Sequence, residues 1–409
     1  MTVIVCGAGA AGLMAAGTAA QYADKVILIE KNDRVGKKLR ITGKGRCNIT
    51  NAREIEDMID MYPSNGKFLY SALYTFTNDD IVALLEKEGV EVKTERGGRI
   101  FPVSDDARDV VAAMRRYALK PNVKLIRAEV KSLITENGRI KGVRTSVKNF
   151  YGDSVIICTG GKSYPQTGSD GSGYRLAKSA GHTIIKPVPS LVPLTVKEKW
   201  CRDLSGLSLK NVEITAFGSD GARISSGFGE MLFTHFGVSG PLLLSLSSHI
   251  RGGKAQGCTI EINLKPALSP EQLDARILRD FDQKKKKHLV NSLDDLLPKA
   301  LIPVIIEEAG IEPHKPVCEI SRAQRHALVE TLRHLTLHVT GFRPIEEAIV
   351  TSGGVKTSEI DPSTMESKLM KGLYFAGEVI DVDGYTGGYN LQAAWSTGYL
   401  AGLNAGGGI

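Results

Sequence analysis

Residues 1–30 alternate between apolar runs and turn residues in the order of a strand–helix–strand unit. Val3–Cys6 is a short, β-branched apolar run, as a strand buried in a parallel sheet requires. A glycine-rich turn follows it, and Leu13–Tyr22 is rich in Ala and Leu, which predicts a helix. Val26–Ile29 is a second apolar run and ends at Glu30. The pattern therefore predicts the opening unit of a doubly wound α/β fold.

The same alternation continues to about residue 190. Amphipathic periodicity predicts helices over Asn78–Glu88 and Ala107–Leu119, the second capped by Asp105 or Asp106. Apolar runs predict strands over Val123–Ile126 and Ser154–Cys158, and a hairpin of Glu129–Ile134 and Ile140–Thr145 around the turn Glu136–Arg139. Gly168–Gly173 precedes a predicted helix, Tyr174–Ala180, but no apolar strand runs into it, so it does not predict a second dinucleotide site.

The middle of the chain changes character after Pro187, Pro189 and Pro193. Residues 194–265 hold short strand-like runs, such as Val212–Phe217 and Thr259–Leu264, which predict a small antiparallel sheet or barrel. Residues 267–335 carry helix starts at Ser269–Glu271, at a capping-box-like Ser292–Asp295 and at Ser321. We therefore expect a discontinuous domain of residues 1–190 and 350–409, a barrel-like domain of residues 191–265 and 336–349, and a helical insertion of residues 266–335.

The first glycine-rich turn has the spacing of a dinucleotide-binding loop. Gly7 permits the tight turn, Gly9 lets the backbone approach a pyrophosphate, and Gly12 lets the helix pack closely on the sheet. Glu30 lies about 20 residues later, where a carboxylate accepts hydrogen bonds from a ribose. The candidate cofactor contacts in this half of the chain are Gly7, Gly9, Ala10, Ala11, Gly12, Glu30, Lys31, Lys37, Lys38, Leu39, Arg46, Val130, Thr159, Gly160 and Gly161.

The C-terminal segment supplies the other half of such a site. Leu373–Ala376 reads as a strand that ends at Gly377, and the glycine-rich loop Asp383–Asn390 leads into a predicted helix, Leu391–Leu403. The N-terminus of that helix is a fixed positive partial charge, which stabilises a reduced, anionic flavin. Together the two ends of the chain point to non-covalently bound FAD, with further candidate contacts at Gly377, Glu378, Asp381, Gly388, Tyr389, Asn390 and Leu391.

Composition narrows the class of protein. Hydrophobic content of 42% and charged content of 24% are those of a soluble globular protein, and no apolar stretch is long enough to span a membrane. The six cysteines have no Cys-x-x-Cys spacing and the eight histidines no metal-ligand spacing, which predicts a cytoplasmic protein without a bound metal. A net charge of +7 permits contact with nucleic acid, and Lys284–His288 is the densest basic run, although a solvated helix end is its simpler interpretation.

With these motifs in view, the chain resembles the BaiN/RdsA family of flavoproteins over essentially its whole length. The sharpest marker is Ile41–Asn51, in which many members have glycine at the position of Lys44; the others are Phe233–Pro241, Thr351–Gly354 and the Ala-Gly-Glu-x-x-Asp closure at Ala376–Asp381. The resemblance implies a glutathione-reductase-type FAD-binding Rossmann domain with inserted β-barrel-like and helical domains. It also implies one of three activities: reduction of unsaturated 3-oxo bile acids, reduction of a ribosomal RNA uridine to dihydrouridine, or oxidation of aminoacetone.

The first two activities share one chemistry, in which reduced flavin adds a hydride to an activated C=C. Such a reaction needs a group that holds the enolate oxygen and an acid that protonates the second carbon. Our candidates for these roles are His235, Arg99 and Tyr385, with Arg46 and Tyr389 as further possibilities and a structural role as the alternative for each. Cys47 lies in a tight backbone turn, so we do not expect it to be a nucleophile.

The best substrate hypothesis is a small enone such as an unsaturated 3-oxo bile acid, and the alternatives are ribosomal RNA uridine and an aminoacetone-type amine. NAD(P)H is the expected electron donor. Because the sequence shows no second nicotinamide-binding fold, we expect it to bind only briefly over the flavin, unless another donor serves. The pattern carries no signal for an oligomeric state.

Overall fold

The computed structural model describes residues 1–250 and 255–408. It divides into two compact units, one formed by Met1–Ser190 with Pro344–Ile409 and the other by Leu191–Arg343. Each unit has its own hydrophobic core. Within the described ranges, no helix combines the length and the apolar character that crossing a membrane requires.

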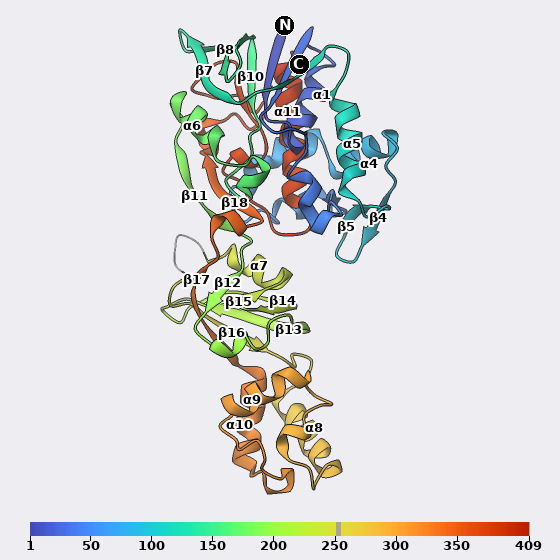
Figure 1. The fold of residues 1–409 in the computed structure, drawn as a ribbon, viewed down its shortest axis with the longest axis vertical. Helices are drawn as coiled ribbons and strands as arrows, with labels where there is room; N and C mark the ends of the chain where they lie inside the picture. Colours follow the sequence, from blue (N-terminus) through green and yellow to red (C-terminus); the bar gives the residue numbers. More distant parts are fainter. Residues whose placement is uncertain (251–254, 409) are drawn as a thin grey trace. The chain divides into compact units, whose positions relative to one another are not determined.

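A five-stranded parallel sheet forms the centre of the first unit (Figure 1). Its order is β19 (Leu373–Phe375), β10 (Ser154–Ile157), β1 (Thr2–Cys6), β2 (Lys25–Glu30) and β6 (Val123–Arg127). All neighbouring strands run parallel, and every one of them is a strand that the apolar runs predict. The sheet confirms the α/β class and brings the two ends of the chain together, because β19 and β1 both pair with β10.

Two helices from opposite ends of the chain pack against each other over this sheet. They are α1 (Ala10–Ala19) and α11 (Tyr389–Ala405), which lie side by side in Figure 1. Gly398 and Gly402 lie four residues apart on α11, and Gly406 follows as its C-cap. A Cβ at Gly398 or Gly402 would lie 2.5 Å from a backbone oxygen of α1. The close helix contact therefore depends on a glycine stripe.

The other helices of this unit begin where local signals place them. Thr77 caps α4 (Asn78–Lys87) in a capping box with Asp80, and Asp106, rather than Asp105, caps α5 (Ala107–Ala118). The remaining helices are α2 (Ile55–Ile59), α3 (Tyr70–Thr75) and α6 (Ser172–Ser179).

Three smaller sheets complete the first unit. The predicted hairpin is confirmed as β7 (Val130–Glu136) and β8 (Arg139–Thr145), with positive φ at both Asn137 and Gly138, and β9 (Asn149–Tyr151) extends it. The other two sheets are the long pair β11 (Ile184–Ser190) and β18 (Val350–Val355), and the three-stranded sheet β3 (Thr50–Asn51), β5 (Arg99–Pro102) and β4 (Val92–Glu95).

A closed antiparallel barrel forms the first part of the second unit. Its strands, in barrel order, are β12 (Leu194–Val196), β15 (Gly237–Ser239), β14 (Arg223–Thr234), β13 (Ser208–Phe217), β16 (Thr259–Asn263) and β17 (Leu335–Phe342). Helix α7 (Pro241–Ser247) packs on β14, where Leu242 lies over Gly227 and Gly229. The barrel confirms the antiparallel interpretation of this region.

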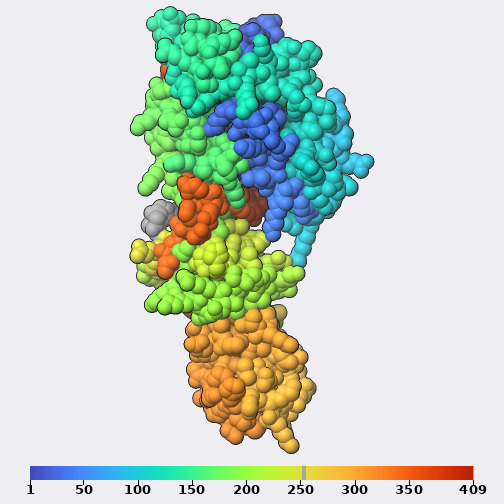
Figure 2. Space-filling view, viewed as in Figure 1, coloured from blue at the N-terminus to red at the C-terminus, as the bar shows by residue number. Residues whose placement is uncertain are grey.

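A helical segment follows β16 and shares the barrel's hydrophobic core. It holds α8 (Pro270–Gln283), α9 (Ile302–Glu308) and α10 (Arg322–Arg333), shown in orange in Figure 2. Capping boxes at Ser269 and Ser321 are confirmed.

The helix start expected at Ser292 is wrong. Ser292 Oγ donates to the carbonyl of His288, and Asp294 and Asp295 both pair with Lys284, so the residues that resemble a capping box instead close a turn after α8.

Candidate cofactor site

The loop between β1 and α1 has the shape of a phosphate cradle. Gly7 has φ +102°, and a Cβ at Gly12 would lie 1.8 Å from the Gly7 carbonyl oxygen, so both positions require glycine. A Cβ at Gly9, by contrast, would meet nothing within 4 Å. Gly9 is the N-cap residue of α1 and has no side chain that could accept the N–H groups of the first turn. A pyrophosphate fits this arrangement.

Glu30, at the end of β2, is held beside this loop. One carboxylate oxygen accepts the Ala8 N–H at 2.8 Å, and the other accepts the Asn32 backbone N–H at 2.9 Å and its amide at 2.7 Å. Val130 begins β7 close by, because the Ala128 N–H donates to the Glu30 carbonyl. The carboxylate therefore has a fixed orientation at the position where a dinucleotide ribose is expected.

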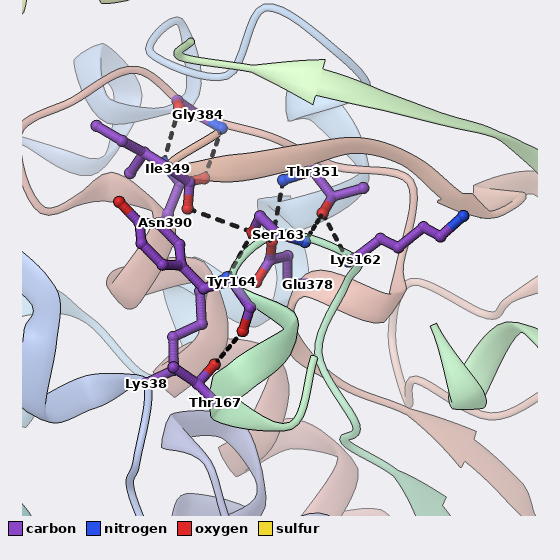
Figure 3. A network of polar contacts seen from close by, with 10 residues as sticks. All are labelled: Lys38, Lys162, Ser163, Tyr164, Thr167, Ile349, Thr351, Glu378, Gly384 and Asn390. Atoms are coloured by element: carbon purple, nitrogen blue, oxygen red, sulfur yellow. Dashed lines mark hydrogen bonds and ion pairs between the residues drawn. The ribbon is translucent and has the colours of Figure 1, made fainter. Parts of the chain in front are cut away.

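A second, partly buried network joins the N-terminal half of the chain to its C-terminal segment (Figure 3). Lys38 Nζ lies 2.7 Å from both Ser163 Oγ and Glu378 Oε2. Glu378 Oε1 accepts the Ser163 hydroxyl at 3.0 Å and the Thr351 N–H at 2.9 Å. Thr351 Oγ1 in turn accepts the N–H groups of Lys162 and Ser163. This network fixes two predicted contacts, Lys38 and Glu378, that are 340 residues apart in the sequence.

The C-terminal loop meets the same site. A Cβ at Gly377 would lie 2.8 Å from the Cβ of Ala11, so the turn after β19 packs directly on α1. The Asn390 side chain accepts the Gly384 N–H and donates to the Gly384 carbonyl, which closes the loop before α11 (Figure 3). Gly388 has φ +102°, and any Cβ there would lie 2.3 Å from the Thr50 carbonyl oxygen. Asp381 accepts the Asn65 amide at 3.1 Å.

The turn after β10 completes the surroundings of the loop. A Cβ at Gly7 would lie 3.2 Å from the Cα of Thr159, and Gly160 has φ +72°. Thr159 Oγ1 and Arg40 Nε are buried without a hydrogen-bond partner in the protein. A glycine cradle in which no protein atom approaches the Gly9 position fits a bound dinucleotide. Lys37 and Leu39 belong to the same stretch as Lys38, where Lys37 is half-buried and Leu39 is buried.

Lys31 lies at the edge of this region. Its ammonium group is 2.8 Å from Asp170 Oδ2. Burial alone would raise the pKa of Asp170, but hydrogen bonds from Lys31 and Ser172 outweigh it and lower the pKa to about 2. Lys31 is therefore bound to a carboxylate of the protein, and its predicted contact with the cofactor stays a prediction.

The structure places Arg46 and Arg99 apart from the Lys38 network, on the small sheet around Phe101. Arg46 pairs with Glu95 and, at 2.8 Å, with Asp105, and its guanidinium lies 4.1 Å from the Phe101 ring centroid. Arg99 donates to the Arg96 carbonyl and is half-exposed. Both arginines have a structural role here, and substrate or phosphate binding by them stays a prediction.

The remaining candidate catalytic residues lie in both units. His235 is exposed in the second unit, in the turn between β14 and β15, with its ring 4.9 Å from that of Phe236. Tyr385 and Tyr389 lie in the first unit, where the Tyr385 N–H donates to the Met61 carbonyl and Tyr389 is buried beside Tyr62. Cys47 is buried with φ +61°, and burial raises the pKa of its thiol to about 12, which does not favour a nucleophilic thiolate.

Several residues that fix the site carry no sequence signal of their own. Asn32, Asn65 and Ser163 each make long-range contacts with the predicted contacts or their neighbours. Thr351 belongs to the Thr-Ser-Gly-Gly marker of the family resemblance, so the sequence singles it out. Only the fold shows that its hydroxyl accepts the N–H groups of Lys162 and Ser163 and so holds that turn.

Comparison with known proteins agrees with this geometry. Residues 1–404 match the family model described as the HI0933-like protein Rossmann domain. The chain is 33% identical over 408 residues to the 3-dehydro-bile acid delta(4,6)-reductase of Clostridium scindens, covering 98% of both chains. It is 34% identical over 408 residues to the ribosomal RNA dihydrouridine synthase of Haemophilus influenzae, covering 98% of this chain and 97% of that one.

Solved structures of similar fold are far more distant in sequence. The 3-ketosteroid delta1-dehydrogenase from Sterolibacterium denitrificans matches with a TM-score of 0.50 and 15% identity, covering 100% of both chains. The FrdA subunit of Escherichia coli quinol fumarate reductase matches with a TM-score of 0.51 and 15% identity, covering 99% of this chain and 70% of that one. These matches concern the fold alone.

Proposed function

Because the chain belongs to the HI0933-like (BaiN/RdsA) family of FAD-dependent flavin oxidoreductases, we propose that it reduces a C=C bond conjugated to a carbonyl group. The two relatives named above support this reaction class. A bile-acid delta(4,6)-reductase and a dihydrouridine synthase act on different molecules, but each saturates a C=C that a carbonyl activates. When bound, FAD supplies the hydride for such a reaction.

The observation that carries the proposal is the meeting of the two chain ends at one site. Gly377 lies against Ala11, and Lys38 is bonded to Glu378, so the β1–α1 loop and the loop before α11 line one continuous region. The N–H groups at the start of α1 would hold the pyrophosphate, and Glu30 would hold the ribose. The start of α11 would face the flavin ring, where its positive end stabilises negative charge.

The reaction also needs a proton and a partner for the developing oxyanion. We assign the proton to Tyr385, because it lies in the loop Asp383–Asn390 that the Asn390 side chain closes. Arg99, which lies in the same unit as this loop, is the candidate for the carbonyl oxygen, and the role expected of His235 stays a prediction. A Tyr385→Phe variant should bind FAD normally and reduce substrate at least tenfold more slowly, since general acid catalysis contributes about 10²–10⁴ in rate.

An unsaturated 3-oxo steroid, such as a bile-acid enone, is our first candidate substrate. Besides the reductase relative, the charge of the helical segment supports a small molecule: residues 266–335 contain 11 Lys and Arg against 11 Asp and Glu. Lys284, the first residue of the basic run, is paired with Asp294 and Asp295 of the same segment. A segment with equal numbers of positive and negative side chains attracts the RNA phosphate backbone only weakly.

Ribosomal RNA is the second candidate, and a different observation favours it. Residues 31–53 contain eight Lys and Arg against one Asp, and the dihydrouridine synthase relatives cover almost the whole chain. Lys31, Lys38 and Arg46 of that stretch are paired with carboxylates, which leaves less positive charge for a phosphate backbone than the count suggests.

The test is an anaerobic reaction of the photoreduced holoenzyme with each candidate. We expect a 3-oxo-Δ4 or 3-oxo-Δ4,6 bile acid to reoxidise the flavin and to gain two mass units. Dihydrouridine formed in protein-free ribosomal RNA, with no reaction of the enone, would establish the second candidate instead. In a separate aerobic assay of the oxidised holoenzyme, peroxide release with aminoacetone, together with no C=C reduction of either substrate in the anaerobic assay, would overturn the reaction class.

NAD(P)H is our proposed electron donor. Among the described residues, the parallel sheet with the β1–α1 loop is the one Rossmann-type unit, so we expect the nicotinamide to reach the flavin without a dinucleotide domain of its own. Anaerobic bleaching of the flavin by NADH or NADPH tests this, and a failure of both would assign reduction to another donor.

A further inference from the structure

A loop segment outside the predicted contacts connects Glu30 and Glu378, the two carboxylates of the site. Residues 162–170, which we call the strap, follow Gly161 in the turn after β10. They return to the same point, because the Gly171 N–H donates to the Gly161 carbonyl at 3.1 Å. Inside the strap, the Thr167 hydroxyl and N–H both donate to the Tyr164 carbonyl. Its shape is therefore defined by its own hydrogen bonds, and the sequence motif Gly168–Gly173 lies at its end.

One end of the strap is attached to Glu378. Ser163 Oγ lies between Lys38 Nζ at 2.7 Å and Glu378 Oε1 at 3.0 Å, and Figure 3 shows these three side chains pointing toward one another. This attachment uses Glu378, one of the predicted cofactor contacts.

The other end is attached to Glu30 through Asn32. The Asn32 amide donates to Glu30 Oε1 at 2.7 Å and to the Thr167 carbonyl at 3.0 Å, so one NH₂ group joins the carboxylate to the strap. A Cβ at Gly168, which has φ +106°, would lie 2.6 Å from the Asn32 amide nitrogen. Glycine at 168 is therefore what lets the strap come this close.

A glutamate at a strand end has three side-chain torsions and loses considerable freedom when it binds a ligand. Here Asn32 and the Ala8 N–H hold both carboxylate oxygens before any ligand arrives. Pre-ordering of this kind raises affinity, because the entropy cost of binding is met in advance.

We propose that Asn32 is a positioning residue for the cofactor: by tying Glu30 to the strap, it fixes the carboxylate that receives the adenosine ribose of FAD. Its role concerns how tightly the protein retains FAD and not the reaction, so it holds whichever substrate is reduced. Asn32 acts on the adenosine half of the cofactor alone.

The test uses apoprotein titrated with FAD, with Asn32→Ala as the variant. Loss of hydrogen bonds to a charged group should raise the FAD Kd about tenfold. Asn32→Asp, which is isosteric but cannot donate to the Thr167 carbonyl and repels Glu30, should raise it at least as much. Arg34→Ala is the matched control, because Arg34 is exposed in the same turn and pairs with Asp33. The FAD Kd of this variant should stay within twofold of the wild-type value.

Two further measurements separate positioning from a general loss of structure. ADP carries the adenosine ribose without the flavin, so Asn32→Ala should weaken ADP as a competitor by the same factor as FAD. The melting temperature of the apoprotein should fall by less than that of the holoprotein, and the midpoint potential of bound FAD should not change. An unchanged FAD Kd, a weaker FAD with unchanged ADP affinity, or an apoprotein destabilised as much as the holoprotein would each overturn the proposal.

Discussion

Lys44 occupies a backbone conformation that suits glycine. It has φ 60° and ψ 38°, in the left-handed region, and its side chain is exposed. Many members of the family that the sequence resembles have glycine at this position, and the structure gives the physical reason. The left-handed turn is required by the backbone, and lysine adopts it at a cost.

Replacing Lys44 by glycine should therefore stabilise the protein. We expect Lys44→Gly to raise the free energy of unfolding by about 1 kcal/mol, because removal of the Cβ relieves the strain of the left-handed conformation. This value already allows for the greater conformational entropy of glycine in the unfolded chain, which opposes the gain. Urea unfolding measures this change. Lys67→Gly, an exposed lysine in a helical turn, is the control and should destabilise by about 0.5–1 kcal/mol. A loss of stability in both variants would contradict the account.

His182 is a buried group whose charge state affects stability. Ser367 Oγ accepts the N–H groups of Leu369 and Met370, so its own proton points to His182 Nε2 at 2.7 Å. Glu359 Oε2 lies 3.4 Å from Nδ1. Burial lowers the pKa of His182 below its usual value, and the opposing effect of Glu359 does not cancel it.

A lowered histidine pKa means that the unfolded chain takes up the proton first. The contribution of His182 is therefore complete above about pH 6.5 and is lost as the pH falls below that value toward the folded pKa. We expect the free energy of unfolding of wild type to exceed that of His182→Gln by less at pH 5.5 than at pH 8. A gap between the two proteins that is constant, or wider at pH 5.5, would show that His182 is not held neutral.

For single residues, the sequence predicts those roles that depend only on neighbours in the chain. The Asp106 cap and the Asn137–Gly138 turn depend on a few adjacent residues, so their patterns predict them. The partners Ser163 of Lys38 and Asn65 of Asp381 are more than 100 residues away, and no local pattern contains them.

Among the elements, the pair α1 and α11 matters most for the site, because both helices begin there. Alanine and glycine line the contact, and a Cβ at Gly402 would lie 2.5 Å from the Ala15 carbonyl oxygen and 3.0 Å from the Thr18 Cβ. The sequence predicts both helices, but their pairing follows only from the parallel sheet that lies beneath them. Local signals also fail where tertiary contacts compete, as when Asp294 and Asp295 bind Lys284 instead of starting a helix.

Gly402→Ala should force these two helices apart. We expect it to lower the free energy of unfolding by about 1–3 kcal/mol, the usual cost of overpacking, and to weaken FAD binding because the starts of both helices shift. Thermal unfolding and FAD titration measure the two effects. Asn404→Ala, on the same helix, should change stability by less than about 0.5 kcal/mol. Equal effects of the two substitutions would contradict close packing of α1 on α11.

At the scale of the whole molecule, both ends of the chain meet at one candidate FAD site. The apolar runs predict the parallel sheet and the barrel, because strand burial leaves a clear pattern. The family adds the cofactor, and the relatives divide between a bile-acid reductase and RNA dihydrouridine synthases. The charge distribution and the fold are compatible with both substrates, so the reaction with each defined substrate decides between the bile-acid enone and the RNA uridine.

Gly9 allows the most direct test of the central claim. It has φ −80° and ψ −164°, which other residues adopt, and a Cβ there would meet no protein atom within 4 Å. Gly9→Val should therefore fold with the melting temperature of the wild-type apoprotein, yet its side chain would fill the space that the pyrophosphate needs. The measurement is FAD binding to the two apoproteins: we predict tight, equimolar binding by wild type and none by Gly9→Val, whereas equal binding by both would contradict the site described.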